Sequence, residues 1–534
     1  MDDMDISKRN KLLFLSLLAL LNIIVRIPSI PHERGSPDEF TIHILANSLS
    51  TFGHANWWVH PSSVFGFYPY SYASSAPFVY SEISQSAGMD LEWVAWIFCA
   101  LMGIFVMLSA YIMAGQIKDD DLFKFLVAFA VSLSQGVLTY LTWQISARGV
   151  FIALLPLFIY LLLKSRVFAI RCGALTFITV ILLMATHHYY ILIVPIVLSF
   201  ISVMIFYKLK RSVTKLGRFP DNLTNIALII GFLGLFSIPF FTNLFVQGSR
   251  YSALYGMLES SIRYSGPFFV LAIVGFSYLV LKSDRKFGEW FMIFTSMFFA
   301  PFMWVGVYAH YFATIIICTL MCTALVNIAK AYKENQKQTF SILIIVLLLF
   351  VGFSGFYQHW RTNIGGGQRP CQWYVEDTTY NGALWAGDNI DKSKRVIGCS
   401  DNDHTPTRVF AISKIPTIVM PETDITYGFV NVSDIKVTMN SPLSVEFYED
   451  NPYILSDIYP KTTSDRWYLG CLDIDNAEAK QIINKYKFSY YIEDINFQET
   501  FAISLREGEK QVLLYDNGRI RIWCLDMLVG ELDG

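Results

Sequence analysis

Long apolar runs alternate with short charged segments over the first two-thirds of the chain. A helix needs about 20 mostly apolar residues to cross the hydrocarbon core of a bilayer. Runs close to this length, bounded by charged residues or by Pro and Gly, predict about eleven membrane-spanning helices. We place these helices at residues 12–28, 93–115, 122–142, 149–164, 170–186, 190–207, 225–246, 267–282, 287–305, 310–329 and 340–357.

Basic residues recur in every second connection between these segments, and this asymmetry predicts the orientation of the chain. Lys8, Arg9 and Lys11 precede the first segment, and further Lys and Arg clusters follow the fourth, sixth, eighth and tenth. Positively charged loops face the cytoplasm in most membrane proteins. We therefore expect a multi-pass protein of the cell membrane with a cytoplasmic N-terminus. The long loop 29–92 and everything after residue 357 would face outward.

The pattern changes after the last apolar run. Short alternating stretches at 395–398, 489–492 and 511–515 predict strands, and Asp516-Asn517-Gly518 before the stretch 519–523 predicts a hairpin turn. Two stretches with helical periodicity complete this region, at 380–390 and 477–486. The sequence thus predicts a transmembrane domain at 1–357, followed by an extracytoplasmic soluble α/β domain at 358–534.

Composition narrows the function classes. Hydrophobic residues make up 54% of the chain and charged residues 16%, against about 25% charged residues in soluble domains. The formal net charge of −2 argues against nucleic-acid binding, which normally needs a basic face. The tail carries four cysteines, Cys371, Cys399, Cys471 and Cys524, which permit two disulfides in three pairings. They form no CxxC motif, so no zinc site is predicted.

The stretch Ser36-Pro37-Asp38-Glu39 places two adjacent carboxylates just beyond the first apolar segment. Ser at the N-cap, Pro at the first helical position and acids in the first turn are typical of a helix start. This structural interpretation is compatible with a catalytic one, because the same cap would hold Asp38 in place. We interpret Asp38, with Glu39 beside it, as the candidate base that removes a proton from an incoming hydroxyl.

Several cationic or ionisable residues fall at the same predicted membrane face. They would stabilise the charge that develops on a departing phosphate. An outward Arg148 runs against the positive-inside bias, which favours a functional interpretation. For His187 and His188 the alternative is an interfacial aromatic belt. For Arg250 and Arg263 it is nonspecific binding of lipid head groups. The candidate binding residues are His43, Arg148, His187, His188, Arg250, Arg263 and His310.

Two features of the sequence resemble a known class. Pro37-Asp38-Glu39 opens the first outer loop, and the stretch from Tyr515 through Asp516-Asn517-Gly518 to Trp523 is similar to a strand pair found in an archaeal branch. The chain resembles the GT-C membrane glycosyltransferases, which include protein O-mannosyltransferases, aminoarabinose transferases and oligosaccharyltransferase catalytic subunits. The resemblance implies a polyprenyl (dolichyl) phosphate sugar donor, membrane lipids as surroundings, and transfer with inversion on the outer face. Glycan, glycolipid or protein would be the acceptor, and Asp38 the base.

The chain also departs from the oligosaccharyltransferase pattern. Oligosaccharyltransferases carry a second acidic motif, a divalent metal and a Trp-Trp-Asp motif that opens the soluble domain. This chain has no Trp-Trp-Asp, and the nearest stretch is Cys371-Gln372-Trp373-Tyr374. We therefore expect addition of a single sugar and assign no metal ligands, leaving a divalent cation open as a cofactor. The alternatives are an oligosaccharide ligase or transferase, and a transporter or flippase of lipid-linked glycans. Transporters usually show internal repeats and mid-membrane ionisable groups, and the sequence has no clear repeat.

Overall fold

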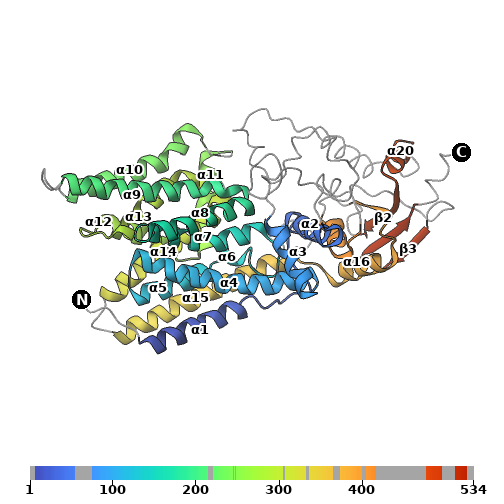
Figure 1. The fold of residues 1–534 in the computed structure, drawn as a ribbon, viewed down its shortest axis with the longest axis horizontal. Coiled ribbons are helices and arrows are strands. Elements are labelled where there is room, and N and C mark those ends of the chain that lie inside the picture. The colour runs from blue at the N-terminus through green and yellow to red at the C-terminus, as the bar shows by residue number, and fades with distance from the viewer. Residues whose placement is uncertain are drawn as a thin grey trace.

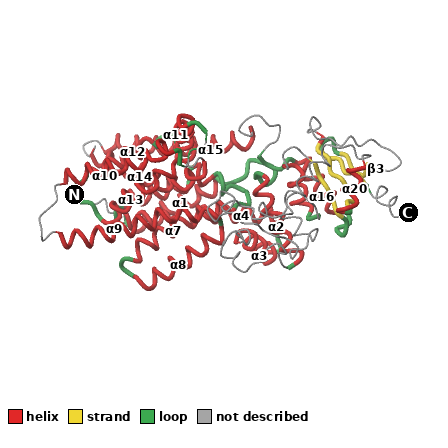
Figure 2. The backbone as a smooth tube through the Cα atoms, turned by 90° about the horizontal axis from the view of Figure 1, so that it is seen from above, coloured by secondary structure: helices red, strands yellow, loops and turns green. Residues whose placement is uncertain are grey.

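The fold is taken from a computed structural model of the chain. It describes residues 7–53, 75–213, 221–244, 246, 248–304, 307–331, 336–364, 373–399, 404–415, 477–495 and 512–525. A helical bundle forms one end of an elongated molecule, and a small sheet forms the other (Figures 1 and 2).

The bundle contains the predicted apolar segments as helices. The elements of this half are α1 (Lys8–Ile24), α2 (Pro37–Phe52), α3 (Ser75–Ala87), α4 (Leu91–Ile117), α5 (Asp121–Ser132), α6 (Gln135–Leu138), α7 (Ala147–Ser165), α8 (Ala169–Thr186), η2 (His188–Leu192), α9 (Ile193–Val213), α10 (Asp221–Thr242), α11 (Arg250–Ser265), α12 (Val270–Leu281), α13 (Phe287–Phe299), η3 (Ala300–Trp304), α14 (Val307–Ala331) and α15 (Gln336–Ile364).

The chain is a polytopic α-helical membrane protein. Each predicted segment coincides with a helix, and seven of the helices in the described ranges are long and apolar enough to cross a membrane. The count rises to eight if α11 and α12, which meet at 93°, form one broken span. Four predicted spans are shorter helices: α1 has 17 residues, α5 and α12 have 12 each, and α13 has 13. The predicted segments run past the ends of α5, α12 and α13, whereas α1 has the predicted length but begins four residues earlier.

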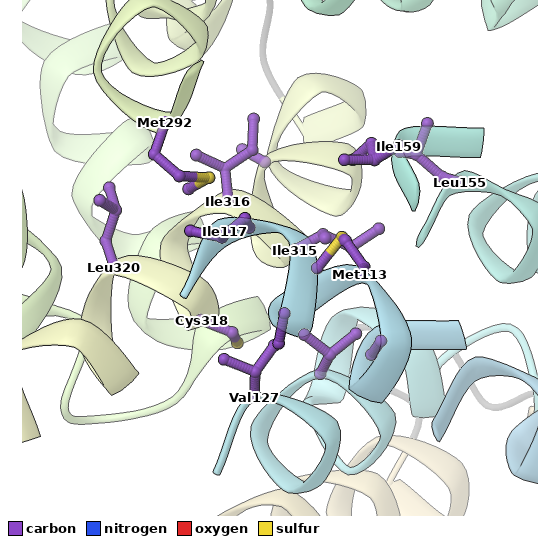
Figure 3. Close-up of a cluster of buried hydrophobic side chains, with 14 of the residues drawn as sticks. Met113, Ile117, Val127, Leu155, Ile159, Met292, Ile315, Ile316, Cys318 and Leu320 are labelled. Atoms are coloured by element: carbon purple, nitrogen blue, oxygen red, sulfur yellow. The ribbon is translucent and has the colours of Figure 1, made fainter. Parts of the chain in front are cut away.

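A single large apolar core holds the bundle together. It is built mainly from α4, α5, α7, α13 and α14, and Figure 3 shows part of it, including Met113, Val127, Ile159 and Ile315. Polar side chains are buried in the bundle as well, and pairs such as Asn22–Ser132 and Gln135–Gln358 are hydrogen-bonded. Helix association therefore combines van der Waals packing with hydrogen bonds.

The backbone breaks after α5, and a buried cation satisfies the broken end. The Arg26 guanidinium is fully buried and donates to the carbonyl oxygens of Ser132 (3.1 Å) and Leu141 (2.8 Å). Non-helical backbone inside a membrane protein needs such partners. A Cβ at Gly103 of α4 would lie 2.5 Å from Cζ of Arg26, so only glycine leaves room for this guanidinium. Residues 133–146 are thereby held in a fixed path that leads to α7.

The C-terminal part contains the predicted strands and helices. Its elements are α16 (Asp377–Asn389), β1 (Arg395–Cys399), α17 (His404–Ser413), α20 (Ala477–Tyr486), β2 (Phe488–Asp494), β3 (Val512–Asp516) and β4 (Ile520–Cys524). The strand order is β1-β2-β4-β3, with β1 parallel to β2 and the other pairs antiparallel. Gly518 has a φ of +83° in the turn between β3 and β4, as the Asn-Gly signature predicts.

Helix α2 belongs to both halves of the molecule. Phe40 and Ile44 on one face pack into the C-terminal core, whereas Ile42 and Ala46 pack against α3 and α4. The segment predicted as a long outer loop therefore contains two helices, α2 and α3, and one of them supplies part of the C-terminal core. Residues 54–74, which hold most of the aromatic residues of that loop, lie outside the described part of the chain.

Candidate active site

The start of α2 is fixed by a capping box. Oε2 of Glu39 accepts a hydrogen bond from the backbone N–H of Ser36 at 2.7 Å and another from the Ser36 hydroxyl. Together with a proline in the first turn, this pattern orients the helix start tightly. The predicted cap is confirmed, and it places the Asp38 side chain on the solvent side of α2, where 56% of it is exposed.

Asp38 forms an ion pair with Arg148, so the structure brings two predicted site residues together. Nη2 of Arg148 lies 2.9 Å from Oδ2 of Asp38. The Arg148 side chain is only 13% exposed, whereas the Asp38 side chain faces the exterior. The pair thus presents a carboxylate to solvent and holds the guanidinium behind it.

Arg148 owes its position to the first turn of α7. The Ser146 hydroxyl caps this helix by accepting from the backbone N–H of Gly149 at 3.3 Å. A Cβ at Gly149 would lie 2.4 Å from the carbonyl oxygen of Tyr140, so glycine permits the close approach of that segment. The Tyr140 ring then lies 5.8 Å from Cζ of Arg148, in cation–π geometry.

Glu39 lies beneath this pair and is buried. Its Oε1 accepts from the side-chain amide of Gln144 at 3.3 Å and lies 3.9 Å from Nη1 of Arg148. Both oxygens therefore have partners in the fold, so Glu39 acts as a positioning residue for α2 and Arg148. Gln144 was missed from the sequence because it is neutral and follows a predicted span; its place just before the α7 cap is the signal that could have found it.

A row of buried tyrosines connects Arg148 to a second predicted cation. The Tyr140 and Tyr311 rings meet at 4.7 Å, and the Tyr311 and Tyr264 rings at 4.4 Å. The guanidinium of Arg263 lies over the Tyr264 ring at 5.2 Å and over the Tyr357 ring at 5.3 Å. The structure therefore joins the first turn of α7 with α11, α14 and α15 at one end of the bundle.

The predicted histidines are buried parts of the fold. His43 lies one turn after Glu39 on α2, and its Nδ1 is 2.5 Å from Oε1 of Glu33. His310 on α14 has Nε2 at 3.1 Å from the carbonyl oxygen of Met303 and Nδ1 at 3.5 Å from the Ser261 hydroxyl. His43 thus contacts the segment before α2, and His310 connects α14 with η3 and α11. A direct role in phosphate binding stays a prediction for both residues.

The remaining predicted residues lie on other elements. His187 caps α8 and is buried against the Phe151 ring, with a centroid distance of 6.4 Å. The side chain of His188 lies outside the described part of the structure. Arg250 begins α11, donates to Oδ1 of Asn243 at 2.7 Å and lies over the Phe240 ring. The contacts of Arg250 are thus with the end of α10.

A polar cluster fastens the C-terminal domain next to the site. Nδ1 of His32 lies 2.9 Å from Oε1 of Glu92 on α4, and Nε2 lies 3.2 Å from Oδ1 of Asp377 on α16. The His32 ring stacks on Tyr380 at 3.7 Å. Burial, followed by the charge of Glu92, raises the pKa of Tyr380 to about 12. Both halves of the protein therefore meet close to the start of α2.

The side chains around Asp38 do not fit a divalent cation. A hard cation needs several oxygen ligands, but Asp38 faces a guanidinium and both Glu39 oxygens accept hydrogen bonds. In the described ranges, no group of three or more His, Cys, Asp or Glu residues is placed to hold a metal ion.

The comparisons with known proteins concern the fold. No protein-family model matches the chain, and a search of curated proteins gives no significant match. Among solved structures, the chain is similar to the oligosaccharyltransferase of Archaeoglobus fulgidus tethered to an acceptor peptide with an NVT sequon. The identity is 11% and the TM-score 0.57, over 92% of this chain and 70% of that one. For the same enzyme with an inhibitory peptide and a dolichol-phosphate, the identity is 13% and the TM-score 0.56, over 92% of this chain and 70% of that one.

The chain has a GT-C fold. A weaker likeness, to ArnT from Cupriavidus metallidurans bound to undecaprenyl phosphate, has a TM-score of 0.47 at 12% identity, over 99% of this chain and all of that one, and is too low to add to the argument. The likeness extends over both the helical bundle and the C-terminal part, since it covers 92% of this chain. The resemblance inferred from Pro37-Asp38-Glu39 is therefore confirmed at the level of fold.

Proposed function

We propose that this chain is a glycosyltransferase. It transfers a sugar from a polyprenyl (dolichyl) phosphate donor to an acceptor hydroxyl at the outer membrane face, in surface-glycan or protein glycosylation. One observation carries the proposal: within a GT-C fold, a half-exposed Asp38 carboxylate lies 2.9 Å from a shielded Arg148 guanidinium, at the bundle end covered by the C-terminal domain.

The chemistry follows from this pairing. The acceptor oxygen attacks the anomeric carbon while its proton passes to the Asp38 carboxylate. The bond between that carbon and the phosphate oxygen breaks, and the electron pair leaves with the lipid phosphate. Arg148 stabilises the negative charge that develops there. Attack opposite to the leaving group inverts the anomeric configuration.

The ion pair has a consequence for substrate binding. A guanidinium binds carboxylate and phosphate with the same planar donors. A donor phosphate at Arg148 therefore competes with Asp38 for the guanidinium and releases the carboxylate toward the acceptor. The tyrosine row behind Arg148 keeps the guanidinium in place during this exchange. The donor phosphate, in this proposal, contacts Arg148 and not the buried His43 or His310.

The proposal extends to topology. The basic clusters beside the other bundle end favour a cytoplasmic location for that end. The Asp38 end and the C-terminal domain then face outward, where a lipid-linked sugar would be presented. Cysteine labelling from either side of the membrane, at positions in α2 and in the C-terminal domain, tests this orientation. Labelling of the two from opposite sides would overturn it.

The test of the activity uses the purified full chain with dolichyl-phosphate hexoses and an acceptor extract. Parent protein should form a lipid-free glycoconjugate, and Asp38→Asn should lower the rate by roughly 10²- to 10⁴-fold, the usual contribution of a general base. Asp90→Asn is the matched control, because Asp90 is an exposed carboxylate at the α4 start. An Asp38→Asn protein as active as the parent would contradict the assignment of the base.

A second candidate function has one specific observation in its favour. The two solved structures compared above at a TM-score above 0.5 are of an oligosaccharyltransferase. Transfer of a whole glycan to an Asn side chain would be that activity, and an NVT peptide with a lipid-linked oligosaccharide is the discriminating substrate. The side chains around Asp38 favour the single-sugar reaction, since they do not fit a divalent cation.

A further inference from the structure

A cavity of about 100 Å³ lies beside the candidate site, at the same end of the bundle. This volume holds several water molecules. Val25 and residues 27–30 just after α1 line the cavity, together with Gly355 and Gln358 of α15 and with Thr142 and Trp143. The Arg34 guanidinium forms part of the lining. The lining thus combines apolar residues with the polar residues Ser29, Thr142 and Gln358 and one cation, Arg34.

A second buried cation adds to the positive potential near this cavity. Arg26, between the lining residues Val25 and Ile27, is fully buried, and its partners in the described part of the chain are uncharged. Arg26 and Arg34 both donate to carbonyl oxygens of one short segment, those of Leu141 and Thr139. Charges act more strongly in a low-dielectric surrounding than in water. Two guanidiniums so close to one cavity favour an anionic occupant.

The cavity is flanked by surfaces that face lipid. On the α1 side, Leu20, Ile24 and Ile27 are each more than half exposed, and Ile27 itself lines the cavity. On the α15 side, Phe356 is 71% exposed and follows the lining residue Gly355. Both helices lie along one edge of the bundle (Figure 1). Exposed apolar stripes of this kind lie against acyl chains in a membrane protein.

We propose that this cavity binds the phosphate headgroup of a glycerophospholipid whose acyl chains lie along α1 and α15. This is a second lipid site, separate from the donor position proposed at Arg148. It is linked to that position by hydrogen bonds, because Nε of Arg34 donates to Oε1 of Gln144 at 3.0 Å and Gln144 donates to Glu39. A bound headgroup would steady Arg34 and, through Gln144, the start of α2.

Gly355→Phe is the most direct test. A Cβ at Gly355 meets no atom within 4 Å, so a larger side chain there fills the cavity without removing a charge. Gly352→Phe is the matched control, because Gly352 lies one turn earlier on α15, also has open space, and does not line the cavity. The full chain is purified in mild detergent and titrated with radiolabelled phosphatidylglycerol. We expect Gly355→Phe to bind it roughly tenfold more weakly than the parent, and Gly352→Phe to bind it equally well.

Three further measurements test whether the occupant is anionic and whether it is a lipid. Arg34→Gln should weaken phosphatidylglycerol binding by a similar factor. Zwitterionic phosphatidylcholine should compete poorly; equal competition would overturn the anionic assignment. Inorganic phosphate should not displace the lipid at equal concentration; equal affinity would overturn the assignment to a lipid.

If Gly355→Phe fails to fold, Ile27→Trp fills the cavity from the α1 side, with Ile24→Trp as its control. Parent-like binding by a folded cavity-filling variant would refute the proposal.

Discussion

The two ends of the helical bundle carry the same kinds of charged side chain in opposite arrangements. At the end far from the sheet, Asp120 and Asp121 are nearly buried and pair with Lys330 of α14 and Lys11 of α1, the latter at 2.6 Å. At the other end, Asp38 is more than half exposed, and its Arg148 partner is shielded. The first arrangement ties helices together. The second leaves a carboxylate open to an incoming molecule, so burial of the acid separates a structural pair from a candidate catalytic one.

The packing of α2 against both halves of the molecule makes the second arrangement possible. The buried face of α2 is held by Phe40 and Ile44 in the C-terminal core and by Ile42 in the bundle. The polar start of the helix can then remain exposed without losing its orientation. The pairs at the far end need no such support, since Asp120 and Asp121 lie at the start of a packed helix.

The largest effect is expected from weakening the packing of α2 against the C-terminal core. Phe40→Ala deletes a side chain that is only 2% exposed, and such truncations cost about 3–5 kcal/mol. We expect a clear fall in the thermal unfolding midpoint in detergent and, with it, loss of transfer activity. Phe78→Ala on α3 is the control, because that ring is 42% exposed. Equal losses for both variants would contradict the role given to α2.

The next effect concerns the exposed pair itself. Arg148→Gln removes the charge that we assign to the donor phosphate, and charged hydrogen bonds contribute about 1.5–3 kcal/mol. The donor KM should rise roughly 10- to 100-fold. Arg148→Lys should recover part of this loss, because it keeps the charge but not the planar fork. Arg250→Gln is a control at an arginine whose contacts are with α10. A KM that Arg148→Gln leaves unchanged would remove Arg148 from donor binding.

A smaller effect is expected at the far end. Lys330→Gln breaks the pair with Asp120, and the Lys330 side chain is 20% exposed. Partly exposed pairs contribute up to about 1 kcal/mol, so the unfolding midpoint should fall slightly while the transfer rate stays at the parent value. Lys330→Arg should restore the midpoint. A large loss of transfer activity in Lys330→Gln would mean that the two ends do not differ in role as we infer.

The smallest effect is a pH dependence where the two halves meet. The pKa of Tyr380 is raised from about 10 to about 12 by burial and by the charge of Glu92. A raised pKa means that the folded state holds the proton more tightly than the unfolded state between these values. Stability from this group is present below pH 10 and is lost as the pH rises toward 12. The midpoint of the parent should therefore fall relative to that of Tyr380→Phe over this range, and a constant difference would contradict the assignment.

Much of the helical architecture could be predicted, because it depends on local pattern. Apolar runs located the bundle helices, Ser36-Pro37-Asp38-Glu39 located the start of α2, and the Asn-Gly turn located the β3–β4 hairpin. These signals arise within a few residues of the feature they specify. The predicted cap was confirmed for the same reason.

The features that escaped prediction depend on residues far apart in the chain. The pairing of Asp38 with Arg148 spans 110 positions, and Glu39 meets Gln144 across 105. The α2 sequence also gave no sign that Phe40 would join a core built from residues after 375. Helix α17 was missed because ten residues with mixed polarity give a weak periodic signal. The break after Ser132 inside the predicted segment 122–142 was also missed, since apolar composition does not mark where a helix breaks.

The dual membership of α2 imposes an order on biosynthesis. This helix leaves the ribosome early, but its Phe40 face has no lasting partner until Val375 and the strands beyond it have been made. At about 5–20 residues per second, the delay until the last strand is made is about 25 to 100 seconds. Throughout this interval, the nascent chain would expose the apolar face of α2 at the membrane surface. Truncation before the last strand would therefore leave the earliest part of the protein unfinished as well as the latest.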